Sequence, residues 1–308
     1  FVARYQEIES EWTLAVPVDG SMELWRLRLR NLSSRKRTIL ACSHMMWCLG
    51  AAPDAKREFH RLFINNSFDE KKGAINATKC VWEVPNEKYG HWNTNWAYKA
   101  FHTVWDEEGI VPEGLSAAGD HETFISRHGD WSSPAWLADS NRQTSGFSRH
   151  ADSIAALAVP ITLNPGEEKE IVFATGAVDE AESLNGTLRP YRGKGAFAKM
   201  LGDVEARWSR LLSPMKADTP DDAFNLLTNY WLPYQAISCR LWGRTGYWQQ
   251  SGAFGFRDQL QDSQVFLPNQ PNRCLAQIRL HARHQFADGT VYHWWHPLSE
   301  VGLRTEMT

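Results

Sequence analysis

The hydrophobic pattern of this chain changes its period near residue 186, and this change restricts the possible folds more than any other feature. Up to about residue 178, short apolar runs alternate with polar residues, as in strands. In Trp25-Arg-Leu-Arg-Leu-Arg30, for example, the apolar and the basic side chains would face opposite ways. After Leu184-Asn-Gly186, apolar residues recur at spacings of three and four, which is the period of an amphipathic helix. The sequence therefore predicts an all-β part followed by an all-α part.

Turn signals divide the first part into many short strands. Val18-Asp-Gly20 and Asn31-Leu-Ser-Ser34 separate apolar runs, and Asn164-Pro-Gly166 joins two further runs as a strand, turn, strand unit. Many short strands with this spacing predict a β-sandwich, which we place at residues 1–185. Residues 82–136 are rich in aromatic residues, and we expect loops to dominate there.

Helical signals organise the second part of the chain. We place a helical linker at residues 186–218, whose helix should end before Ser213-Pro214 because the residue before a proline disfavours helical backbone. Thr219-Pro-Asp-Asp222 predicts the start of a longer helix, with the proline at its first position and acids in its first turn. Residues 219–308 would then begin an all-α domain. The helices predicted in this part lie at residues 197–211, 220–241, 256–266 and 272–284.

Composition excludes several classes of partner. The chain has 308 residues, of which 43% are apolar, and this is enough for the cores of two domains. Its net charge of -3, with both signs scattered, provides no basic stripe, so neither nucleic acid nor a membrane is an expected partner. No apolar run approaches the roughly 20 residues that span a bilayer, and Phe1-Val-Ala-Arg4 lacks the regions of a signal peptide.

The cysteines indicate a reducing compartment. They number five, an odd count, and form no pair of the CxxC type. We therefore expect free thiols in a cytoplasmic protein. Cys42, His44 and Cys48 are residue types that can bind a metal ion. They lie in a stretch that is predicted to be a buried strand, however, so we interpret them as buried side chains of that strand.

Aromatic residues gather with polar ones near the end of the chain, which has 15 tryptophans in all. The segment from Gly246 to Asp262, His293-Trp-Trp-His-Pro297 and Gly302-Leu-Arg-Thr305 combine aromatic rings, amides, guanidinium groups and carboxylates. Such surfaces bind sugars, because rings cover the apolar faces of a pyranose while charged groups hydrogen-bond its hydroxyls. The pattern therefore predicts a carbohydrate site, although the tryptophans could also serve only as core anchors.

Two carboxylates lie one helical turn apart within this region. Asp258 and Asp262 would share a face of the predicted helix, and Arg257 and Gln261 would occupy the adjacent stripe. This pattern suits a solvated charged face as well as a face that binds hydroxyl groups. The glycines and aromatics that precede the helix favour the second interpretation.

Other chemistries find weak support. His293 and His296 lie three apart without a cysteine or acidic residue beside them, which is a poor zinc pattern, so we expect no metal and no other cofactor. Ser251 is followed by glycine, but the G-x-S-x-G pattern of a nucleophile elbow is not present.

These motifs resemble glycoside hydrolase family 94, the inverting phosphorylases related to cellobiose and chitobiose phosphorylases and to the phosphorylase region of cyclic β-1,2-glucan synthases. The resemblance rests on Asn229-Tyr-Trp-Leu-Pro-Tyr-Gln235, Arg240-Leu-Trp-Gly-Arg244, Gly255-Phe-Arg-Asp-Gln-Leu-Gln-Asp262 and Asp288-Gly-Thr-Val-Tyr-His-Trp-Trp-His-Pro297. It implies a multi-domain β plus α protein: an N-terminal β-sandwich, a helical linker, an (α/α)6 barrel and a C-terminal β domain. We expect this chain to be a fragment that contains the first two and the start of the barrel.

The resemblance also implies roles for individual residues. The residues implied in binding the glucosyl unit of the substrate are Arg257, Asp258, Asp262, Trp294, Trp295, Arg304 and Thr305. No catalytic residue is expected within the chain, because the catalytic acid would come just beyond Thr308 and the phosphate-binding residues later still. By itself the fragment would then not turn over.

The implied reaction of the intact enzyme is reversible phosphorolysis of a β-glucosidic bond. One carboxylic acid protonates the glycosidic oxygen while inorganic phosphate, the co-substrate, attacks the anomeric carbon from the opposite face. Phosphate is already anionic and needs no general base. The products would be α-glucose 1-phosphate and a shortened acceptor sugar.

The motifs do not identify the acceptor sugar or the kind of protein to which the chain belongs. A β-glucoside oligosaccharide or an aldonate disaccharide is expected, and the intact enzyme is expected to be a homodimer in which residues 89–105 shape the acceptor pocket, with Trp92 as the residue to test. Two alternatives remain: the phosphorylase-like region of a cyclic β-1,2-glucan synthase, and a carbohydrate-binding relative without catalysis.

Overall fold

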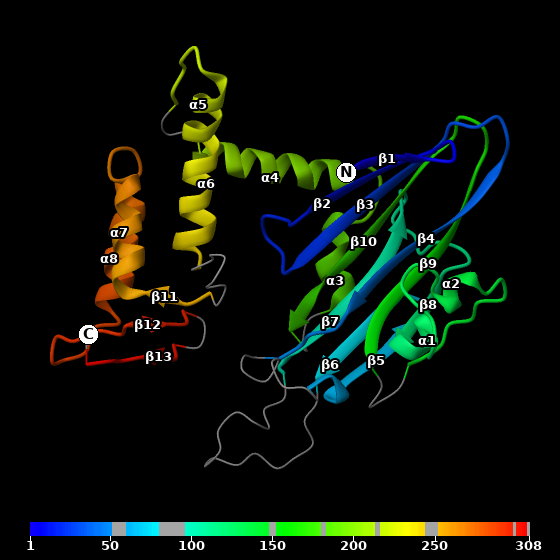
Figure 1. Ribbon diagram of the computed structural model, residues 1–308, viewed down its shortest axis with the longest axis horizontal. Coiled ribbons are helices and arrows are strands. Elements are labelled where there is room, and N and C mark those ends of the chain that lie inside the picture. Colours follow the sequence, from blue (N-terminus) through cyan, green and yellow to red (C-terminus); the bar gives the residue numbers. More distant parts are fainter. Residues whose placement is uncertain are drawn as a thin grey trace. The chain divides into compact units, whose positions relative to one another are not determined.

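The computed structural model describes residues 1–50, 60–79, 96–147, 152–179, 183–212, 216–243, 252–297 and 300–306. The chain divides into two compact units, Phe1–Val204 and Glu205–Thr308. Strands make up most of the first unit, and the second is mainly helical (Figure 1). The predicted order of strands before helices is therefore confirmed. None of the described helices is both long and apolar enough to cross a membrane.

A seven-stranded antiparallel sheet forms the larger layer of the first unit. Its strands, in spatial order, are β1 (Val2–Tyr5), β2 (Ile8–Ala15), β3 (Met22–Asn31), β10 (Glu168–Asp179), β7 (Tyr98–Asp106), β6 (Ala74–Lys79) and β5 (Ile64–Asp69). A second sheet contains β4 (Arg37–Met46), β9 (Ser153–Leu163) and β8 (Ser116–Asp120). The main hydrophobic core combines buried residues of both sheets, so the predicted sandwich is present.

The turn at Asn164-Pro-Gly166 connects the two layers. It joins two strands, as predicted, but β9 pairs with β4 and β8 whereas β10 pairs with β3 and β7. Asn31 is fully buried beside this turn, and its amide nitrogen donates to the carbonyl oxygens of Leu163 and Asn164 at 3.2 and 3.1 Å. The same nitrogen donates to the Arg35 carbonyl at 2.8 Å. The Asn31 side chain therefore links the end of the turn that begins at residue 31 to the turn at residues 164–166.

The segment expected to be rich in loops contains more regular structure than predicted. It contains β7 and β8, with α1 (His121–Ile125) and α2 (Ala135–Ala138). Trp105 lies on β7 and is 1% exposed, so residues 98–105 form a central strand and not the acceptor loop that the sequence predicted. The sequence did not predict this strand because both faces of β7 are buried, so its apolar and polar residues do not alternate as they do in a half-buried strand. Trp92 lies outside the described residues.

Short helices cover the outer face of the large sheet. They are α3 (Leu184–Leu188), a 3-10 turn (Arg189–Tyr191) and the beginning of α4 (Ala196–Leu212). Leu188, Phe197 and Met200 of these helices are buried against Leu24 and Phe101 of the sheet. The predicted helix at residues 197–211 is thus confirmed, and it ends at Leu212, directly before Ser213-Pro214.

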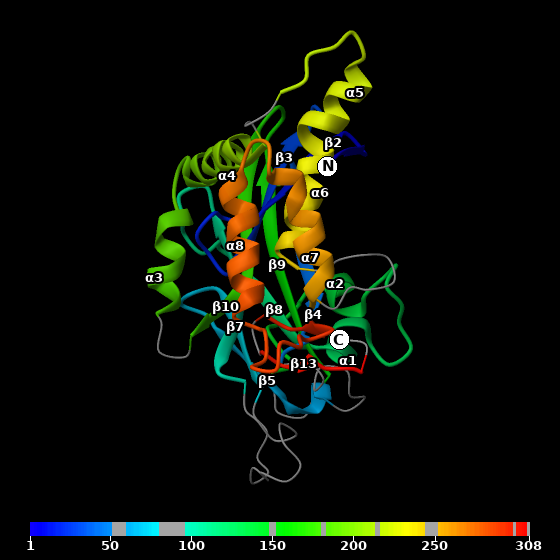
Figure 2. The same ribbon diagram turned by 90° about the vertical axis from the view of Figure 1, so that its left-hand side faces the viewer.

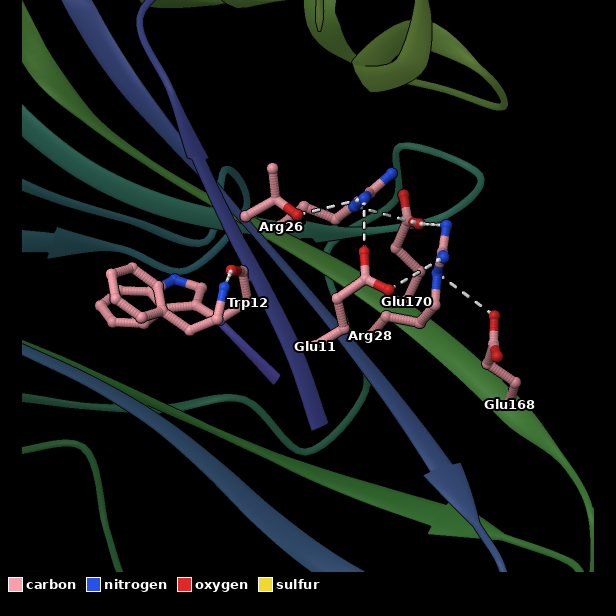
Figure 3. Close-up of polar contacts among 8 residues, drawn as sticks. Glu11, Trp12, Arg26, Arg28, Glu168 and Glu170 are labelled. Atoms are coloured by element: carbon pink, nitrogen blue, oxygen red, sulfur yellow. Dashed lines mark hydrogen bonds and ion pairs between the residues drawn. The ribbon is translucent and has the colours of Figure 1, made fainter. Parts of the chain in front are cut away.

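The same outer face bears a ladder of ion pairs (Figure 3). Arg26 lies 2.8 Å from Glu11 and 3.9 Å from Glu170, while Arg28 lies 3.2 Å from Glu168 and 3.5 Å from Glu170. These residues come from three adjacent strands, with the arginines on β3 between glutamates on β2 and β10. The alternation at residues 25–30 is therefore confirmed, because Leu29 faces the core and the arginines face outward.

In the second unit, one long helix follows the end of α4. It comprises α5 (Asp222–Leu226), a π segment η5 (Leu227–Trp231), α6 (Leu232–Ala236) and a π segment η6 (Ile237–Leu241). The N-cap is Asp221, whose carboxylate accepts from the amides of Ala223 and Phe224 at 2.9 and 3.1 Å. The helix begins two residues later than predicted, because Thr219 pairs with Asn225 instead of capping.

Two further helices follow as predicted. They are α7 (Phe256–Ser263), extended by a 3-10 turn (Gln264–Phe266), and α8 (Pro271–Ala282). Figure 2 shows α7 and α8 side by side, and the two helices are in contact. Phe266 is buried with Ile237 and Leu241 of the long helix, so these side chains form the core of the second unit.

Candidate functional site

A small antiparallel sheet brings together the motifs that the sequence predicted to bind sugar. Its strands are β11 (Phe254–Gly255), β12 (Trp294–Trp295) and β13 (Gly302–Leu303). Gly255 pairs with Trp294, which in turn pairs with Leu303. Since β11 leads directly into α7, the first turn of that helix lies beside the two later motifs. Strands of two residues have no detectable period, so sequence reasoning did not predict this sheet.

Two glycines permit this close assembly. A Cβ atom on Gly302 would lie 2.6 Å from the carbonyl oxygen of Trp294 and 2.8 Å from Cβ of Trp295. A Cβ atom on Gly255 would overlap the carboxylate of Asp258. Only glycine therefore allows β13 to approach β12, and only glycine lets the Asp258 carboxylate fold back over the start of α7.

Arg257 and Asp258 lie in the first turn of α7. The Arg257 side chain is 87% exposed, and its guanidinium lies 3.9 Å from the Asp258 carboxylate, too far for a hydrogen bond. The Asp258 side chain is 23% exposed, and its charge is favoured at the positive end of the helix dipole. The structure thus places an exposed cation and a half-buried carboxylate next to each other at this helix start.

Asp262 lies one turn further along α7, and its carboxylate contacts Nε of Arg240 on the long helix. The predicted helical spacing of Asp258 and Asp262 is confirmed by α7. Sequence reasoning missed Arg240 as a member of the site, although it lies in one of the motifs that carry the family resemblance. Spacing along the chain cannot pair residues on two different helices.

Trp294 and Trp295 have different environments, although both were predicted to line the sugar pocket. Trp295 is fully buried, and its ring centroid lies 4.5 Å from His284 and 4.9 Å from His281. Its ring therefore belongs to the core and offers no face to a ligand, which corrects the prediction. Trp294 is half-buried with its ring 5.6 Å from His296. Neighbours on a strand point to opposite faces, which explains the difference.

Arg304 and Thr305 follow β13 directly. The Arg304 guanidinium contacts the Asp288 carboxylate, and its carbon lies 4.5 Å from the ring centroid of Phe286. Hydrogen bonds from Thr290, together with Arg304, lower the pKa of Asp288 to about 2, so this carboxylate is charged at all ordinary pH values. Thr305 is half-buried. Asp288, which sequence reasoning did not place in the site, thus orients Arg304.

The ring of His281 is buried against the rings of Phe256 and Trp295. Its Nδ1 lies 2.7 Å from the carbonyl oxygen of Gln277, and burial lowers its pKa below the ordinary value. A neutral imidazole is therefore expected there at neutral pH. Among the described residues, no three His, Cys, Asp or Glu side chains are grouped to hold a metal ion.

A cavity of about 570 Å³ opens in the sandwich, between the β7–β8 connection and strands β9 and β10, and none of these motifs lines it. On the segments joined at the start of α7, the Arg257 guanidinium and the Asp258 carboxylate lie next to the strand that bears the partly exposed Trp294. Such a surface can hydrogen-bond hydroxyl groups and cover the apolar face of a ring.

Both parts of the chain match known families. Residues 1–194 match the model described as glycosyl hydrolase 94, supersandwich domain, and residues 207–308 match the glycosyl hydrolase 94 superfamily, catalytic domain.

Full-length relatives are much longer than this chain. The cyclic β-(1,2)-glucan synthase NdvB of Rhizobium meliloti (strain 1021) is 32% identical over 305 residues, which cover 99% of this chain and 10% of that protein. Solabiose phosphorylase of Paenibacillus borealis is 26% identical over 288 residues, or 92% of this chain and 34% of that enzyme. Among solved structures, a bacterial glucoamylase complexed with acarbose has a similar fold, with a TM-score of 0.52, 10% identity and coverage of 94% and 39%.

Proposed function

Because this chain belongs to glycosyl hydrolase family 94, we propose that the whole protein catalyses the inverting, reversible phosphorolysis of a β-glucosidic bond. The products are α-glucose 1-phosphate and a shortened acceptor sugar. Inorganic phosphate is the co-substrate, and no other cofactor takes part. The chain spans about a third of the length of solabiose phosphorylase, so this activity is proposed for the complete protein and not for the chain alone.

One observation carries the proposal. The β11–β12–β13 sheet holds the start of α7 beside the Trp294 and Arg304 segments, which are separated from it by some forty residues of sequence. A solvated charged helix face would need no such assembly. The convergence supports a surface that is built for a ligand with several hydroxyl groups.

We assign the contacts of the glucosyl unit by the chemistry of each group. Arg257 and Asp258 take hydroxyls through charge-assisted hydrogen bonds, and Trp294 covers a C–H face of the ring. Arg304, oriented by Asp288, and Thr305 line the same surface. The catalytic acid and the groups that hold phosphate in line for attack are proposed to follow Thr308 in the whole protein.

The test is phosphate release by the whole protein from α-glucose 1-phosphate with glucose, gluconate or short β-glucans as acceptor. Release that depends on one acceptor is expected, and it would identify the acceptor. Asp258→Asn should lower kcat/KM by about tenfold or more, because a hydrogen bond to a charged group contributes roughly 1.5–3 kcal/mol. Asp203→Asn, in an exposed pair with Lys199 on α4, is the matched control and should leave kcat/KM unchanged. No release with any acceptor in a folded protein would contradict the proposal and favour a carbohydrate-binding relative without catalysis.

A second candidate is the phosphorylase-like region of a cyclic β-1,2-glucan synthase. It is favoured by the 32% identity over 99% of this chain, compared with 26% over 92% for solabiose phosphorylase. Acceptance of β-1,2-linked glucans alone, together with transmembrane helices and a nucleotide-sugar transferase domain encoded upstream, would support this candidate. Acceptance of gluconate or glucose would favour a free-standing phosphorylase.

The setting of the phosphorylase is also a proposal. Cys42, Cys48, Cys239 and Cys274 are free thiols, which supports a reducing, cytoplasmic location. We propose a homodimer for the free-standing enzyme. Light scattering of the whole protein would test this state, and a monomeric mass would contradict it.

A further inference from the structure

The side chains that α7 and α8 bury are mostly small or polar. Gln259 and Ser263 are the buried residues of α7, and Cys274 and His281 are those of α8. Oγ of Ser263 donates to Sγ of Cys274 at 3.3 Å. Such side chains bury little apolar area, so the packing of these two helices depends strongly on the aromatic rings near the start of α7.

The ring of His281 on α8 contacts both segments of the candidate site. It is 1% exposed, and its centroid lies 5.2 Å from that of Phe256 and 4.9 Å from that of Trp295. Both contacts are edge-to-face, a favourable geometry for aromatic rings. Phe256 directly precedes Arg257, and Trp295 directly follows Trp294. One buried ring therefore touches the chain neighbour of a predicted sugar-binding residue on each segment.

The orientation of this ring is fixed from within α8. Nδ1 of His281 lies 2.7 Å from the carbonyl oxygen of Gln277, one helical turn earlier. His284, three residues later, stacks on Trp295 with ring centroids 4.5 Å apart and an angle of 22° between the planes. Trp295 thus has one edge-to-face and one stacked partner, and the two contacts together restrict the tilt of the indole as well as its distance from α8.

The small sheet connects these rings to the exposed residues of the site. Gly255 pairs with Trp294, and the amide of Phe256 donates to the carbonyl of His293 at 3.4 Å. A displacement of the Phe256 ring would therefore move the first turn of α7, which bears Arg257, and would also disturb the strand that bears Trp294. A shift of about 1 Å at a binding group can be costly.

We propose that His281 is a positioning residue, which acts through Phe256 and Trp295 on the side chains that take the glucosyl unit. This rests on the function proposed above. The role belongs to the ring and its packing, and His281 itself does not touch the substrate. A substitution that keeps a ring at this position should therefore keep the site, even if it removes the hydrogen bond to Gln277.

Two substitutions in the whole protein separate the ring from the hydrogen bond. His281→Phe keeps an aromatic ring and loses the N–H donor, whereas His281→Asn keeps a donor close to the backbone and loses the ring. The measurements are KM for α-glucose 1-phosphate, KM for the acceptor, and Kd for α-glucose 1-phosphate by calorimetry. His281→Asn should raise KM and Kd for α-glucose 1-phosphate by about tenfold with acceptor KM unchanged, and His281→Phe should stay within about threefold of the original.

The control is Phe266→Ala, which removes a buried ring of the same unit that packs with Ile237 and Leu241. It should lower Tm without changing KM or Kd, because its contacts lie elsewhere in the unit. If His281→Asn does not fold, His281→Leu takes its place, since it fills similar space without a ring, and it should raise Kd by at least about threefold.

The outcomes separate the possible roles. Loss of Tm with unchanged KM and Kd in His281→Asn or His281→Leu, as expected for Phe266→Ala, would overturn the proposal. An effect of His281→Phe as large as that of His281→Asn would overturn it too, because the hydrogen bond would then matter and the ring would not. A wild type that binds α-glucose 1-phosphate without releasing phosphate contradicts the proposed function, while Kd still decides the role of His281. A wild type that neither binds nor reacts refutes both.

Discussion

At the scale of single residues, Trp294 and Trp295 show why composition alone does not define a sugar site. They are neighbours in the chain, yet Trp295 is enclosed by Phe254, Phe256 and two histidines whereas Trp294 is only half-buried. The sequence predicted both as ligands because it identified the motif, but the face that each ring takes depends on strand pairing over long range.

The pair therefore makes a matched test. Trp295→Ala should lower the free energy of unfolding by about 3–5 kcal/mol, as removal of a large buried aromatic does. Trp294→Ala should cost less than about 1.5 kcal/mol and should instead raise KM for α-glucose 1-phosphate. Urea unfolding and steady-state kinetics of both variants check this, and equal losses of stability would contradict the assignment.

A second residue, His102, is a polar group in the middle of the sandwich. It is fully buried on β7, with Nε2 2.7 Å from Oγ of Ser43 and its ring stacked against Phe173 at 6.0 Å. Burial lowers its pKa to about 3, so the folded protein keeps this ring neutral.

This produces a defined pH dependence. Below about pH 6.5, His102 is protonated in the unfolded chain but stays neutral in the folded protein. The free energy of unfolding should therefore fall from pH 6.5 toward pH 3. The slope from this residue is at most about 1.4 kcal/mol per pH unit. His102→Gln should lose that part of the slope, measured by urea unfolding at pH 7.5 and 5, while His128→Gln, at an exposed site, should keep it. Parallel slopes in the wild type and His102→Gln would refute the account.

At the scale of elements, the strands and helices were predictable because each has a local period. The helices α4 and α8 start and end within two residues of their predicted limits, and α7 with its 3-10 turn ends at Phe266 as predicted. Pairing was not predictable in the same way: the Asn164-Pro-Gly166 turn looks like a hairpin turn, but its strands belong to different sheets. The three two-residue strands at the site escaped prediction because only contacts distant in sequence define them.

The smallest of these elements can be tested through a glycine. Gly302→Ala should push β13 away from β12, since its Cβ would lie 2.6 Å from the Trp294 carbonyl oxygen. We expect a lower Tm and a raised KM for α-glucose 1-phosphate. Gly202→Ala on α4 is the control, because nothing lies within 4 Å of its Cβ; it should stabilise by up to about 1 kcal/mol through helix propensity. A Gly302→Ala variant with unchanged Tm and KM would show that the close approach is dispensable.

At the scale of the whole molecule, the order of a β-sandwich before helices agrees with the family, whose supersandwich and catalytic models cover successive parts of the chain. The structure brings the segments that were predicted to bind the glucosyl unit together at the start of α7. Of residues 89–105, which were predicted to shape the acceptor pocket, residues 98–105 belong to β7 and residues 89–95 lie outside the described residues.

The proposed activity of the whole protein is transfer of a glucosyl unit to phosphate with inversion. The direct measurement is ¹H NMR of the first turnover products when the whole protein acts on a β-glucoside, with and without phosphate. We expect phosphate-dependent appearance of the α-anomer of glucose 1-phosphate. Formation of free glucose without phosphate, or of the β-anomer of glucose 1-phosphate, would contradict it.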